Sequence, residues 1–367
     1  MSFGLDRSTV ADNLLTKGEP VGHYARLFGF STVATLAAII VGSAQAVTIA
    51  TVPVGYAGNA PDPASGSLYG AVPYNYRIGT YDITNSQYVE FLNAKASASD
   101  PYGLWNSHMD PSSFEGAIAR SGSGPFTYSV KTGYANRPVI YVSWYDANRF
   151  VNWLQNGQGN GDTESGTYLI SGGGTNSESV VVPDESQRMT WAATNAFHWL
   201  LPSESEWYKA AYYNPGHGTY YAYPFQSNSA PAALAPPGNS NAGNFNDAAY
   251  NYDGSGSYLN DVGAYPNSLS PFGSLDMGGD VNQYNEALIS GVYRAYRGSD
   301  WAAGSDLSGA VFRNFVFYFP ESVPDTPSVG FRVASVGGVP EPSTVLLAAL
   351  AFNVIWLCPK RFKLSAG

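Results

Sequence analysis

The sequence predicts an α+β domain that is rich in loops and contains only short helices and short strands. Three features indicate this class. Capping-box patterns, in which Ser or Thr is followed three residues later by Gln, Asp or Glu, precede stretches with helical spacing of apolar residues. Segments typical of strands are brief and bounded by turn residues. Long stretches of Gly, Asn, Ser and Pro separate these elements, and no repeat or linker divides the body of the chain.

The helices are predicted from their first residues, where hydroxyl and amide or carboxylate groups satisfy free backbone N–H groups. The boxes are Thr84 with Gln87, Ser143 with Asp146, and Ser203 with Glu206. The first two are followed by apolar stripes formed by Tyr88, Phe91 and Leu92, and by Ala147, Phe150, Val151 and Leu154. The third predicts a short helix over Glu204 to Tyr213.

Short strands are predicted over Tyr74–Tyr81, which alternates in polarity, and over the apolar segment Val139–Val142. Tyr168–Ile170 and Val180–Val182 flank a Gly-rich turn and predict a hairpin. Residues 214–261 form a loop of a length that is uncommon unless something orders it. Tyr293–Ala334 is too aromatic for a loop and too Gly-broken for a long helix, so we expect short strands and turns that close the domain.

The N-terminal residues resemble a secretory signal. Phe28–Gly42 is apolar, follows Lys17 and Arg26, and precedes the cleavage pattern Ala44-Gln45-Ala46. We therefore expect a signal peptide with a long leader over residues 1–46, with a short membrane anchor as the alternative. Residues 47–73 are rich in Gly, Pro and Ala and predict an extended arm.

The C-terminal residues combine Val339-Pro340-Glu341-Pro342, an apolar run over 344–358 and the basic residues Lys360, Arg361 and Lys363. This order resembles the PEP-CTERM sorting signal of exported bacterial proteins, here over 339–363, with a transmembrane helix at 344–358. The resemblance implies processing by an exosortase-type machinery, a transient inner-membrane anchor and a link to exopolysaccharide. An ordinary tail anchor is the alternative.

Charge and cysteine content limit the function classes. Three of the 18 Lys and Arg and three of the 28 Asp and Glu precede residue 47, while three basic residues and Glu341 lie in the tail. The body therefore has 12 basic and 24 acidic residues, a formal charge near −12. Such a body repels nucleic acid, because phosphate binding needs clustered Lys and Arg. The one cysteine, Cys358, lies in the tail, so the body has no disulfide and no cysteine metal site.

Six motifs appear in an order that resembles the formylglycine-generating enzyme family, whose domain is also called the sulfatase-modifying factor domain. They are DITNSQYVEFLNA from Asp82, RPVIYVSWYDANRFVNWL from Arg137, WLLPSESEWYKAAYY from Trp199, PFGSLDMGGDVNQYNEA from Pro271, YRAYRGSDW from Tyr293, and FRN…VGFRVA from Phe312. The resemblance implies a domain over residues 74–336. It also implies a variant of the C-type lectin fold, with twisted antiparallel strands and many loops.

The resemblance also implies where chemistry would occur. Active members of the family oxidise a sulfatase cysteine to formylglycine with a pair of copper-binding cysteines, since thiolates select Cu(I). The corresponding interval, 302–330, contains no cysteine, and the nearest counterparts are Ala303 and Ser308. We therefore expect no copper and no formylglycine-generating activity. The sulfoxide synthase relatives use iron held by His, whereas His108, His198 and His217 are scattered without ligand spacing.

Structural Ca²⁺ is a further expectation from the resemblance, because the family holds calcium with oxygen ligands. Asn244 and Phe245 match one site, with Asp247 or Asp253 as acidic partners. A second site corresponds to Asp280 and Gln283, where Gln in place of the usual Glu weakens the charge. The alternative for these residues is a set of Asx turns with no metal.

The closing segment also supplies the expected ligand-binding surface, because ligands in lectin-like folds are held by loops near this end. Aromatic, Asn and Asp side chains there suit sugars or protein surfaces. The candidates are Asp300, Trp301, Asp306, Arg313, Asn314 and Tyr318. Arg297 and Arg332 are expected to brace the core through buried carbonyls or carboxylates, with ligand contact as the alternative. Glu204 and Glu206 resemble a catalytic pair, but capping and the helix dipole account for them.

These observations predict an exported cell-surface or matrix protein whose sulfatase-modifying-factor-like domain binds glycan or protein without catalysis. One alternative is a formylglycine-generating oxidase that acts on sulfatase cysteine, which the missing cysteines disfavour. Another is a purely structural component of an exopolysaccharide matrix.

Overall fold

The computed structural model describes residues 46–172, 179–290, 293–317 and 327–338. The expected sorting signal over 339–363, with its membrane helix, lies outside these residues, as does the signal peptide apart from Ala46. Among the residues described, no helix has the length and apolar character needed to cross a bilayer.

The helices confirm the capping-box predictions. Helices α1 (Asn85–Lys95), α2 (Trp144–Gln155) and α4 (Glu204–Tyr212) begin after Thr84, Ser143 and Ser203, and both hydrogen bonds of each box are present. A fourth helix, α3 (Glu185–Thr194), was not predicted. Its capping box uses Asp184 with Gln187, and Arg188 is its only buried side chain, so it lacks the apolar stripe that identifies a helix in sequence.

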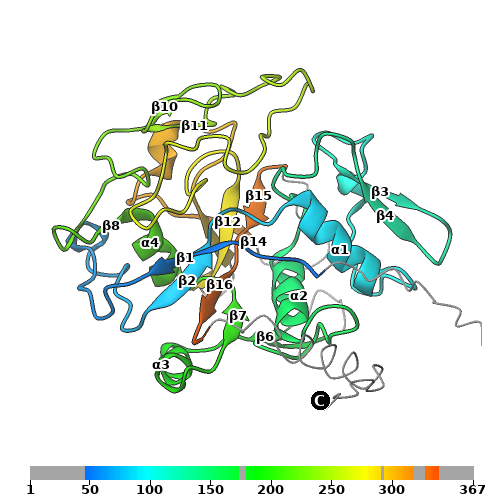
Figure 1. Cartoon of the computed structure of the whole chain (residues 1–367), viewed down its shortest axis with the longest axis horizontal. Coiled ribbons are helices and arrows are strands. Elements are labelled where there is room, and N and C mark those ends of the chain that lie inside the picture. The colour runs from blue at the N-terminus through cyan, green and yellow to red at the C-terminus, as the bar shows by residue number, and fades with distance from the viewer. Residues whose placement is uncertain (1–45, 173–178, 291–292, 318–326, 339–367) are drawn as a thin grey trace, which may run out of the picture. The chain divides into compact units, whose positions relative to one another are not determined.

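Two four-stranded sheets bring the start and the end of the body together (Figure 1). The first has the order β1 (Thr51–Val54), β2 (Tyr76–Gly79), β16 (Ala334–Val336) and β7 (His198–Leu200), all antiparallel. The second has the order β14 (Asn314–Phe317), β13 (Tyr293–Arg297), β12 (Asn282–Ile289) and β15 (Val329–Phe331). Its β12–β15 pair is parallel and the others are antiparallel. The closing segment therefore forms strands, as expected, and the expected N-terminal arm contributes β1.

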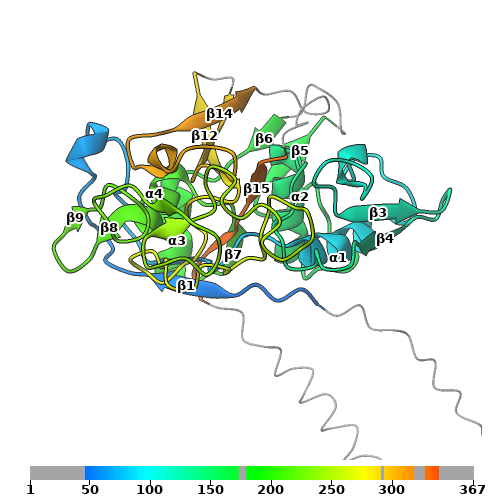
Figure 2. The ribbon, with the colours of Figure 1, turned by 90° about the horizontal axis from the view of Figure 1, so that it is seen from above.

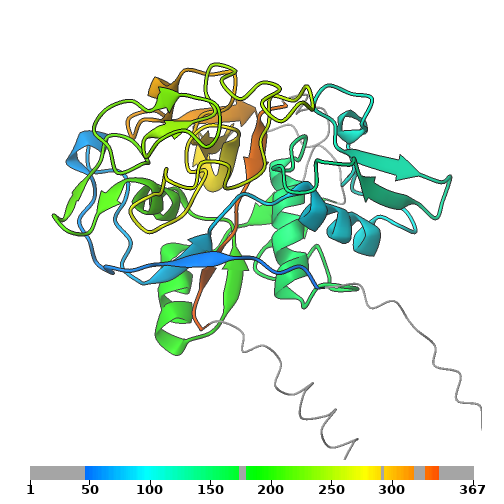
Figure 3. The same cartoon turned by 45° about the horizontal axis from the view of Figure 1, so that its top comes forward.

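Smaller elements complete the domain. The two-stranded pairs are β3 (Ile118–Ser121) with β4 (Thr127–Val130), β5 (Leu169–Ser171) with β6 (Ser179–Val181), β8 (Tyr213–Asn214) with β9 (Thr219–Tyr220), and β10 (Ala232–Ala233) with β11 (Ala242–Gly243). The 3-10 helices are η1 (Pro63–Ser65), η2 (Ser107–Met109) and η3 (Ser305–Ser308). The β5–β6 pair confirms the predicted hairpin. The β3–β4 hairpin packs against α1, as Figure 3 shows.

One predicted strand was wrong. Val139–Val142 is buried as expected, but it forms no ladder, and only the preceding Pro138 makes an isolated bridge, to Thr84. Tyr141 adopts a left-handed backbone with φ 60°, which interrupts the extended conformation that a strand requires. An apolar run of this length indicates burial but not pairing.

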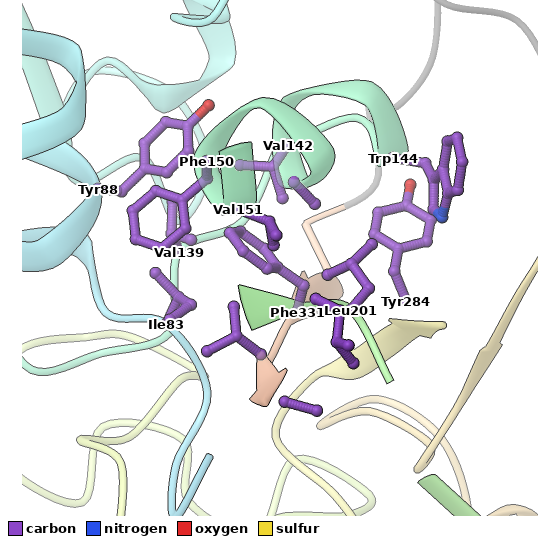
Figure 4. Close-up of a cluster of buried hydrophobic side chains, with 14 of the residues drawn as sticks. Ile83, Tyr88, Val139, Val142, Trp144, Phe150, Val151, Leu201, Tyr284 and Phe331 are labelled. Carbon is purple, nitrogen blue, oxygen red and sulfur yellow. The ribbon is translucent and has the colours of Figure 1, made fainter. Parts of the chain in front are cut away.

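The core lies between α1, α2 and the two sheets. Figure 4 shows Phe150 and Val151 of α2 gathered with Phe331 of β15 and Leu201, all of them fully buried. The ring of Phe150 meets that of Phe331 edge to face, with centroids 5.5 Å apart. Such aromatic pairs add to the stabilisation that their buried area provides.

Arg332 braces this core, as predicted. It is fully buried between β15 and β16 and donates to the carbonyl oxygens of Gly79 at 3.0 Å and Leu275 at 3.0 Å. It also donates to Gln283 Oε1 at 2.7 Å and lies 3.3 Å from the carboxylate of Asp82. Because these acceptors satisfy its buried charge, Arg332 connects the loop before β12 to the first sheet. The long connection between α4 and β12 is coloured green to yellow in Figures 1 and 2, and Arg332 holds it near its end, at Leu275.

Candidate functional site

Arg313, one of the residues expected to bind ligand, lines a cavity of about 230 Å³ in the closing segment. We call it the guanidinium cavity. Its lining residues are Asn282, Arg297, Gly298, Ser299, Leu307, Phe312 and Arg313. The turn that follows Arg297 at the end of β13 has φ 108° at Gly298 and φ 65° at Ser299, and both residues line the cavity.

Glu204, the first residue of α4, holds both guanidinium groups of this cavity. Its Oε1 accepts from Arg297 Nε at 2.9 Å, and its Oε2 accepts from Nη2 of Arg313. Arg297 also donates to the carbonyls of Ala310 at 3.2 Å and Phe312 at 2.7 Å, so its position is fixed. Two guanidinium groups therefore share one carboxylate, and the cluster has a formal charge of +1.

Arg313 is less constrained than Arg297. Its side chain is 25% exposed, against 1% for Arg297. Its Nε is buried and meets no acceptor among the described residues. The ring of Tyr69 lies 4.9 Å from the guanidinium carbon of Arg297 and 5.4 Å from that of Arg313. Arg313 therefore keeps unused hydrogen-bonding capacity at the edge of a hollow.

Asp300 lies beside the cavity and holds its turn. Its Oδ2 accepts from Asn282 Nδ2 at 2.7 Å, and its Oδ1 accepts from the backbone N–H groups of Ala302 at 3.0 Å and Ala303 at 3.1 Å. Burial raises the pKa of the Asp300 carboxyl. The carboxylate thus fixes the loop that follows β13.

Trp301 belongs to a different place, an aromatic cluster made of Phe114, Tyr250, Tyr258 and Trp301. The ring centroids of Tyr258 and Trp301 are 4.5 Å apart, and those of Tyr250 and Tyr258 are 4.4 Å apart. Trp301 is only 9% exposed, whereas Phe114 and Tyr250 are each 52% exposed. The structure therefore separates Trp301 from Arg313, and the exposed aromatic surface comes from residues that the sequence did not indicate.

The remaining surface candidates have simple placements. Asp306 is exposed on η3, the backbone of Asn314 begins β14, and Tyr318 lies outside the described residues. Ser308, a counterpart of a family cysteine, is buried, and its Oγ donates to the Ser305 carbonyl at 2.7 Å. Its own carbonyl accepts from Tyr212 Oη at 2.8 Å. The hydroxyl at this position is therefore part of the scaffold of η3.

Two of the expected calcium ligands lie together. Asn244 and Asp280 are buried, and Asn244 Nδ2 donates at 2.7 Å both to Asp280 Oδ1 and to the Tyr258 carbonyl. The side-chain oxygen of Asn260 is also buried without a hydrogen-bond donor among the described residues, and its backbone N–H donates to Asp280 at 3.1 Å. These oxygen donors suit Ca²⁺ once the Asn244 amide turns its oxygen toward Asp280. Burial raises the pKa of Asp280, and the neighbouring Asp276 and Asp82 act in the same direction.

The other calcium candidates lie elsewhere. Asp253 Oδ2 is 2.6 Å from Nη2 of the buried Arg137, Asp247 is exposed, and Phe245 packs in the interior. Gln283 Oε1 accepts from Trp207 Nε1 at 2.7 Å and from Arg332 Nε at 2.7 Å. Both lone pairs of that oxygen are occupied, so Gln283 does not fit a cation.

Comparison with known proteins shows which family the chain belongs to. A family model described as "Sulfatase-modifying factor enzyme 1-like domain" matches residues 69–336. The chain belongs to this family. The family resemblance of the sequence is therefore confirmed, as is the loop-rich α+β architecture, whereas the lectin-like part of the fold assignment stays a prediction.

Two curated relatives are named hercynine oxygenase. The protein from Mycolicibacterium thermoresistibile is 29% identical over 163 residues, which cover 37% of this chain and 33% of that enzyme. The one from Mycolicibacterium smegmatis is 29% identical over 138 residues, which cover 31% of this chain and 29% of that enzyme. The chain thus spans about a third of these relatives. The solved structure titled "Crystal Structure of CarF" is similar with a TM-score of 0.47 and 16% identity, covering 80% of this chain and 100% of that one.

Several residues of the site were not predicted from the sequence. For Glu204 the sequence indicated only capping and the helix dipole, and its role in the site was not predicted. The one sequence signal for this residue is its position in the first turn, beside a capping box. Tyr258 and Asn260 were hidden in a loop whose polar residues all resemble turn formers. The Tyr258 carbonyl accepts from Asn244, 14 residues earlier, and the Asn260 N–H donates to Asp280, 20 residues later, so neither role shows in the local sequence.

Proposed function

We propose that this chain is an exported binding protein whose family domain has lost catalysis and holds an acidic extracellular ligand, a uronic-acid-bearing glycan, in the guanidinium cavity. The observation on which the proposal rests is the excess of guanidinium over carboxylate at a hollow surface. Glu204 is shared by Arg297 and Arg313, and the second of these is partly exposed. Bidentate carboxylate recognition is the chemistry for which Arg is best suited.

The rest of the cavity supports a sugar acid over a bare anion. Asn282 and Ser299 form a polar part of the lining, with their donors held by Asp300 and the Gly304 carbonyl, while Leu307 and Phe312 offer apolar surface to a ring face. Phe312 is 42% exposed and Leu307 is 36% exposed, so this surface is accessible. A site with a few polar groups within apolar walls is typical of small-molecule recognition.

The test is binding of uronic-acid-containing oligosaccharides to the purified chain by titration calorimetry, with neutral oligosaccharides of the same length alongside. We expect the acidic series to bind and Arg313→Gln to weaken it about tenfold or more, since a hydrogen bond to a charged group contributes ~1.5–3 kcal/mol. Arg120→Gln is the matched control, because Arg120 lies over Trp105 and Phe126, away from the cavity lining. Equal binding of both series, or an unaffected Arg313 variant, would exclude this site. Retention in the matrix without any ligand would favour the structural alternative.

Two enzymatic candidates arise from the family and the relatives. Formylglycine formation would appear as a mass loss of a sulfatase-derived cysteine peptide incubated with the chain and copper. Oxygenase chemistry on hercynine would appear as oxygen uptake with iron(II) and hercynine. Within the described residues no three His, Cys, Asp or Glu side chains group as metal ligands. His198 stacks on Trp191 at 3.8 Å, and His108 contacts Tyr141. We expect neither reaction, and either signal would overturn the non-catalytic assignment.

A structural calcium ion is part of the proposal, held by Asn244, Asp280, the Tyr258 carbonyl and Asn260. It would join the loop after β11 to the turn before β12. Ligands that bind only the folded state raise its stability by about RT ln(1 + [L]/Kd), so CaCl₂ should raise the unfolding temperature relative to EDTA. Asp280→Asn should abolish that rise, with MgCl₂ as the ionic-strength control. Identical unfolding temperatures in CaCl₂ and EDTA would remove calcium from the proposal.

Export and surface location rest on the expected signal peptide and PEP-CTERM segment. Expression of the full chain with an exosortase, followed by fractionation, tests them. We expect a shortened chain in the medium or matrix, and replacing Pro340-Glu341-Pro342 by alanines should leave the uncleaved chain in the inner membrane.

A further inference from the structure

Two glutamine side chains hold the backbone at the start of the described chain, beside α1 and α2 (Figure 1). Val47 N–H donates to Gln158 Oε1 at 2.6 Å, and Gln158 Nε2 donates to the Val47 carbonyl at 2.8 Å. Gln87 Nε2 donates to the Thr48 carbonyl at 3.0 Å. These bonds involve the backbone of Val47 and Thr48 and not their side chains, so they fix where the chain starts. We call Gln87 and Gln158 the glutamine clamp.

Each glutamine of the clamp is itself held by the domain. Gln87 belongs to the capping box of α1, where its Oε1 accepts from Thr84 N–H at 3.0 Å. Gln158 has φ 65°, a left-handed conformation that is uncommon for a residue of this type, and its N–H donates to the Trp153 carbonyl at 2.8 Å. Such a backbone persists only where the surrounding structure fixes it. The clamp is therefore built by α1 and by the loop after α2, and the segment that it holds is not needed to form it.

A cavity of about 270 Å³ lies at the clamp. Ser86 and Glu90 are four residues apart on α1, so they share one face of the helix, and both line the cavity. Ala46 and Val47 line it too. Ala46 is exposed, whereas Val47 is partly buried against the core. The peptide group between Ala46 and Val47 therefore lies at the same cavity as the carboxylate of Glu90.

We propose that the clamp and this cavity bind the α-ammonium group that removal of the signal peptide creates at Val47. The inference rests on the export put forward above. Hydrolysis adds one water across the Ala46–Val47 peptide bond, which leaves a carboxylate on Ala46 and an ammonium on Val47. One N–H of the ammonium keeps Gln158 Oε1 as its acceptor. The other two face the cavity lined by Glu90, so cleavage replaces a neutral peptide group with a cation beside a carboxylate.

The other charged groups on the elements around Val47 already have partners. Lys95 of α1 donates through Nζ to a backbone carbonyl of the loop after α2 at 3.3 Å. In that loop, Asp162 accepts from a hydroxyl and a backbone N–H of its own turn, and Glu164 pairs with Arg149. Glu90 is thus the carboxylate that the cavity offers to the ammonium.

The site would anchor the arm that leads into the first sheet. Val47 and Ile49 pack against the core, and β1 follows at Thr51 on the edge of that sheet. An edge strand is paired on one side only, so it gains from a fixed starting point. Removal of the signal peptide therefore strengthens the attachment of this arm.

The test measures how fast the α-amino group is acylated in the chain from Val47 to Gly367, released from a cleavable tag and analysed by mass spectrometry. The neutral amine is the reactive form, so a carboxylate that raises its pKa above the ordinary value of about 7.7–8.0 slows the reaction at pH 7. A rise of half a pKa unit corresponds to acylation about threefold slower. Glu90→Gln should restore the ordinary rate. Gln158→Asn, which tolerates the left-handed backbone but has a shorter reach, should also speed acylation.

A chain that begins two residues earlier, at Gln45, is the control for position, because its ammonium lies beyond the clamp. It should react at the ordinary rate whether or not Glu90 is replaced. Glu185→Gln is the matched control for Glu90→Gln, because Glu185 is exposed on α3 and does not line this cavity. It should leave the slow acylation of Val47 unchanged.

Equal acylation rates for the native chain and Glu90→Gln, or for the chains that begin at Val47 and Gln45, would overturn the inference. An exported chain whose first residue, read by N-terminal sequencing, is not Val47 would overturn it as well. Failure of export would appear as an uncleaved chain inside the cell, whereas failure of the site would appear in the acylation of the tag-released chain. The two failures are therefore distinguishable.

Discussion

Glu204 and Glu206 are neighbours in the first turn of α4, yet they hold charge clusters of opposite sign. Glu204 is shared by Arg297 and Arg313, which gives +1, while Glu206 and Glu286 share Arg188, which gives −1. Residues two apart on a helix face different directions, so each carboxylate meets a different part of the chain. The same residue type at nearly the same place therefore builds two different environments.

The two clusters also differ in burial. The side chains of Arg188, Glu206 and Glu286 are each at most 4% exposed, whereas Arg313 is 25% exposed. Tyr74 Oη donates to Glu206 at 2.9 Å, and Tyr168 Oη donates to Glu286. We call Arg188, Glu206 and Glu286 the closed cluster, and Glu204, Arg297 and Arg313 the open cluster. A proton on Glu286 can neutralise the net charge of the closed cluster, whereas solvent or a ligand can neutralise that of the open cluster. An unbalanced charge thus marks a binding surface only where something outside the protein can reach it.

The largest expected difference between the clusters is in stability. Arg188→Met leaves Glu206 and Glu286 buried without their counterion, and breaking a buried pair in this way costs about 3–5 kcal/mol. Urea unfolding followed by tryptophan fluorescence measures the loss. Adding Glu206→Gln and Glu286→Gln to Arg188→Met should recover part of it, because the unpaired charges are then gone. A loss no larger than that of Arg313→Met would show that the closed cluster is not the more tightly coupled of the two.

The sequence predicted the capping box of this arrangement but not the partners of the two acids. The pattern Ser203 to Glu206 identified the capping box, and the structure confirms it. The partners of the two acids were not predictable, because Arg188 lies 98 residues from Glu286 and belongs to a helix without an apolar stripe. Likewise the motif order identified the family and the closing strands, whereas the separation of Trp301 from Arg313 depends on how the turn at Gly298 and Ser299 directs the chain.

A smaller effect is expected from pH, and it concerns only the closed cluster. Burial raises the pKa of Glu286 to about 7, above its value near 4.3 in an unfolded chain. The folded state therefore holds this proton more tightly, so the stability that it contributes is complete below pH ~4.3 and is lost as pH rises through about 7. The unfolding free energy of the native chain should fall with pH relative to Glu286→Gln, by at most about 1.4 kcal/mol per pH unit.

Unfolding titrations of both proteins between pH 4 and pH 8 measure that difference, and the other buried carboxyls with raised pKa values, such as Asp82 and Asp146, are common to both and cancel. Parallel pH profiles would mean that Glu286 keeps the same proton in the folded and unfolded chain. The proposed difference between the clusters, in which a proton neutralises the net charge at Glu286 and a ligand neutralises that at Arg313, would then be wrong.

The smallest effect should come from Arg313→Gln, which is expected to cost less than about 1 kcal/mol, because a partly exposed ion pair contributes little. Glu204 keeps its buried partner Arg297 in that variant, so no charge is stranded. Arg297→Gln is the comparison and should cost more, since Arg297 also satisfies the carbonyls of Ala310 and Phe312. Thermal unfolding of the two variants measures the loss of stability in each. If Arg313→Gln destabilises the chain as much as Arg297→Gln, then Arg313 is a brace like Arg332, and the open cluster has no guanidinium to offer a ligand.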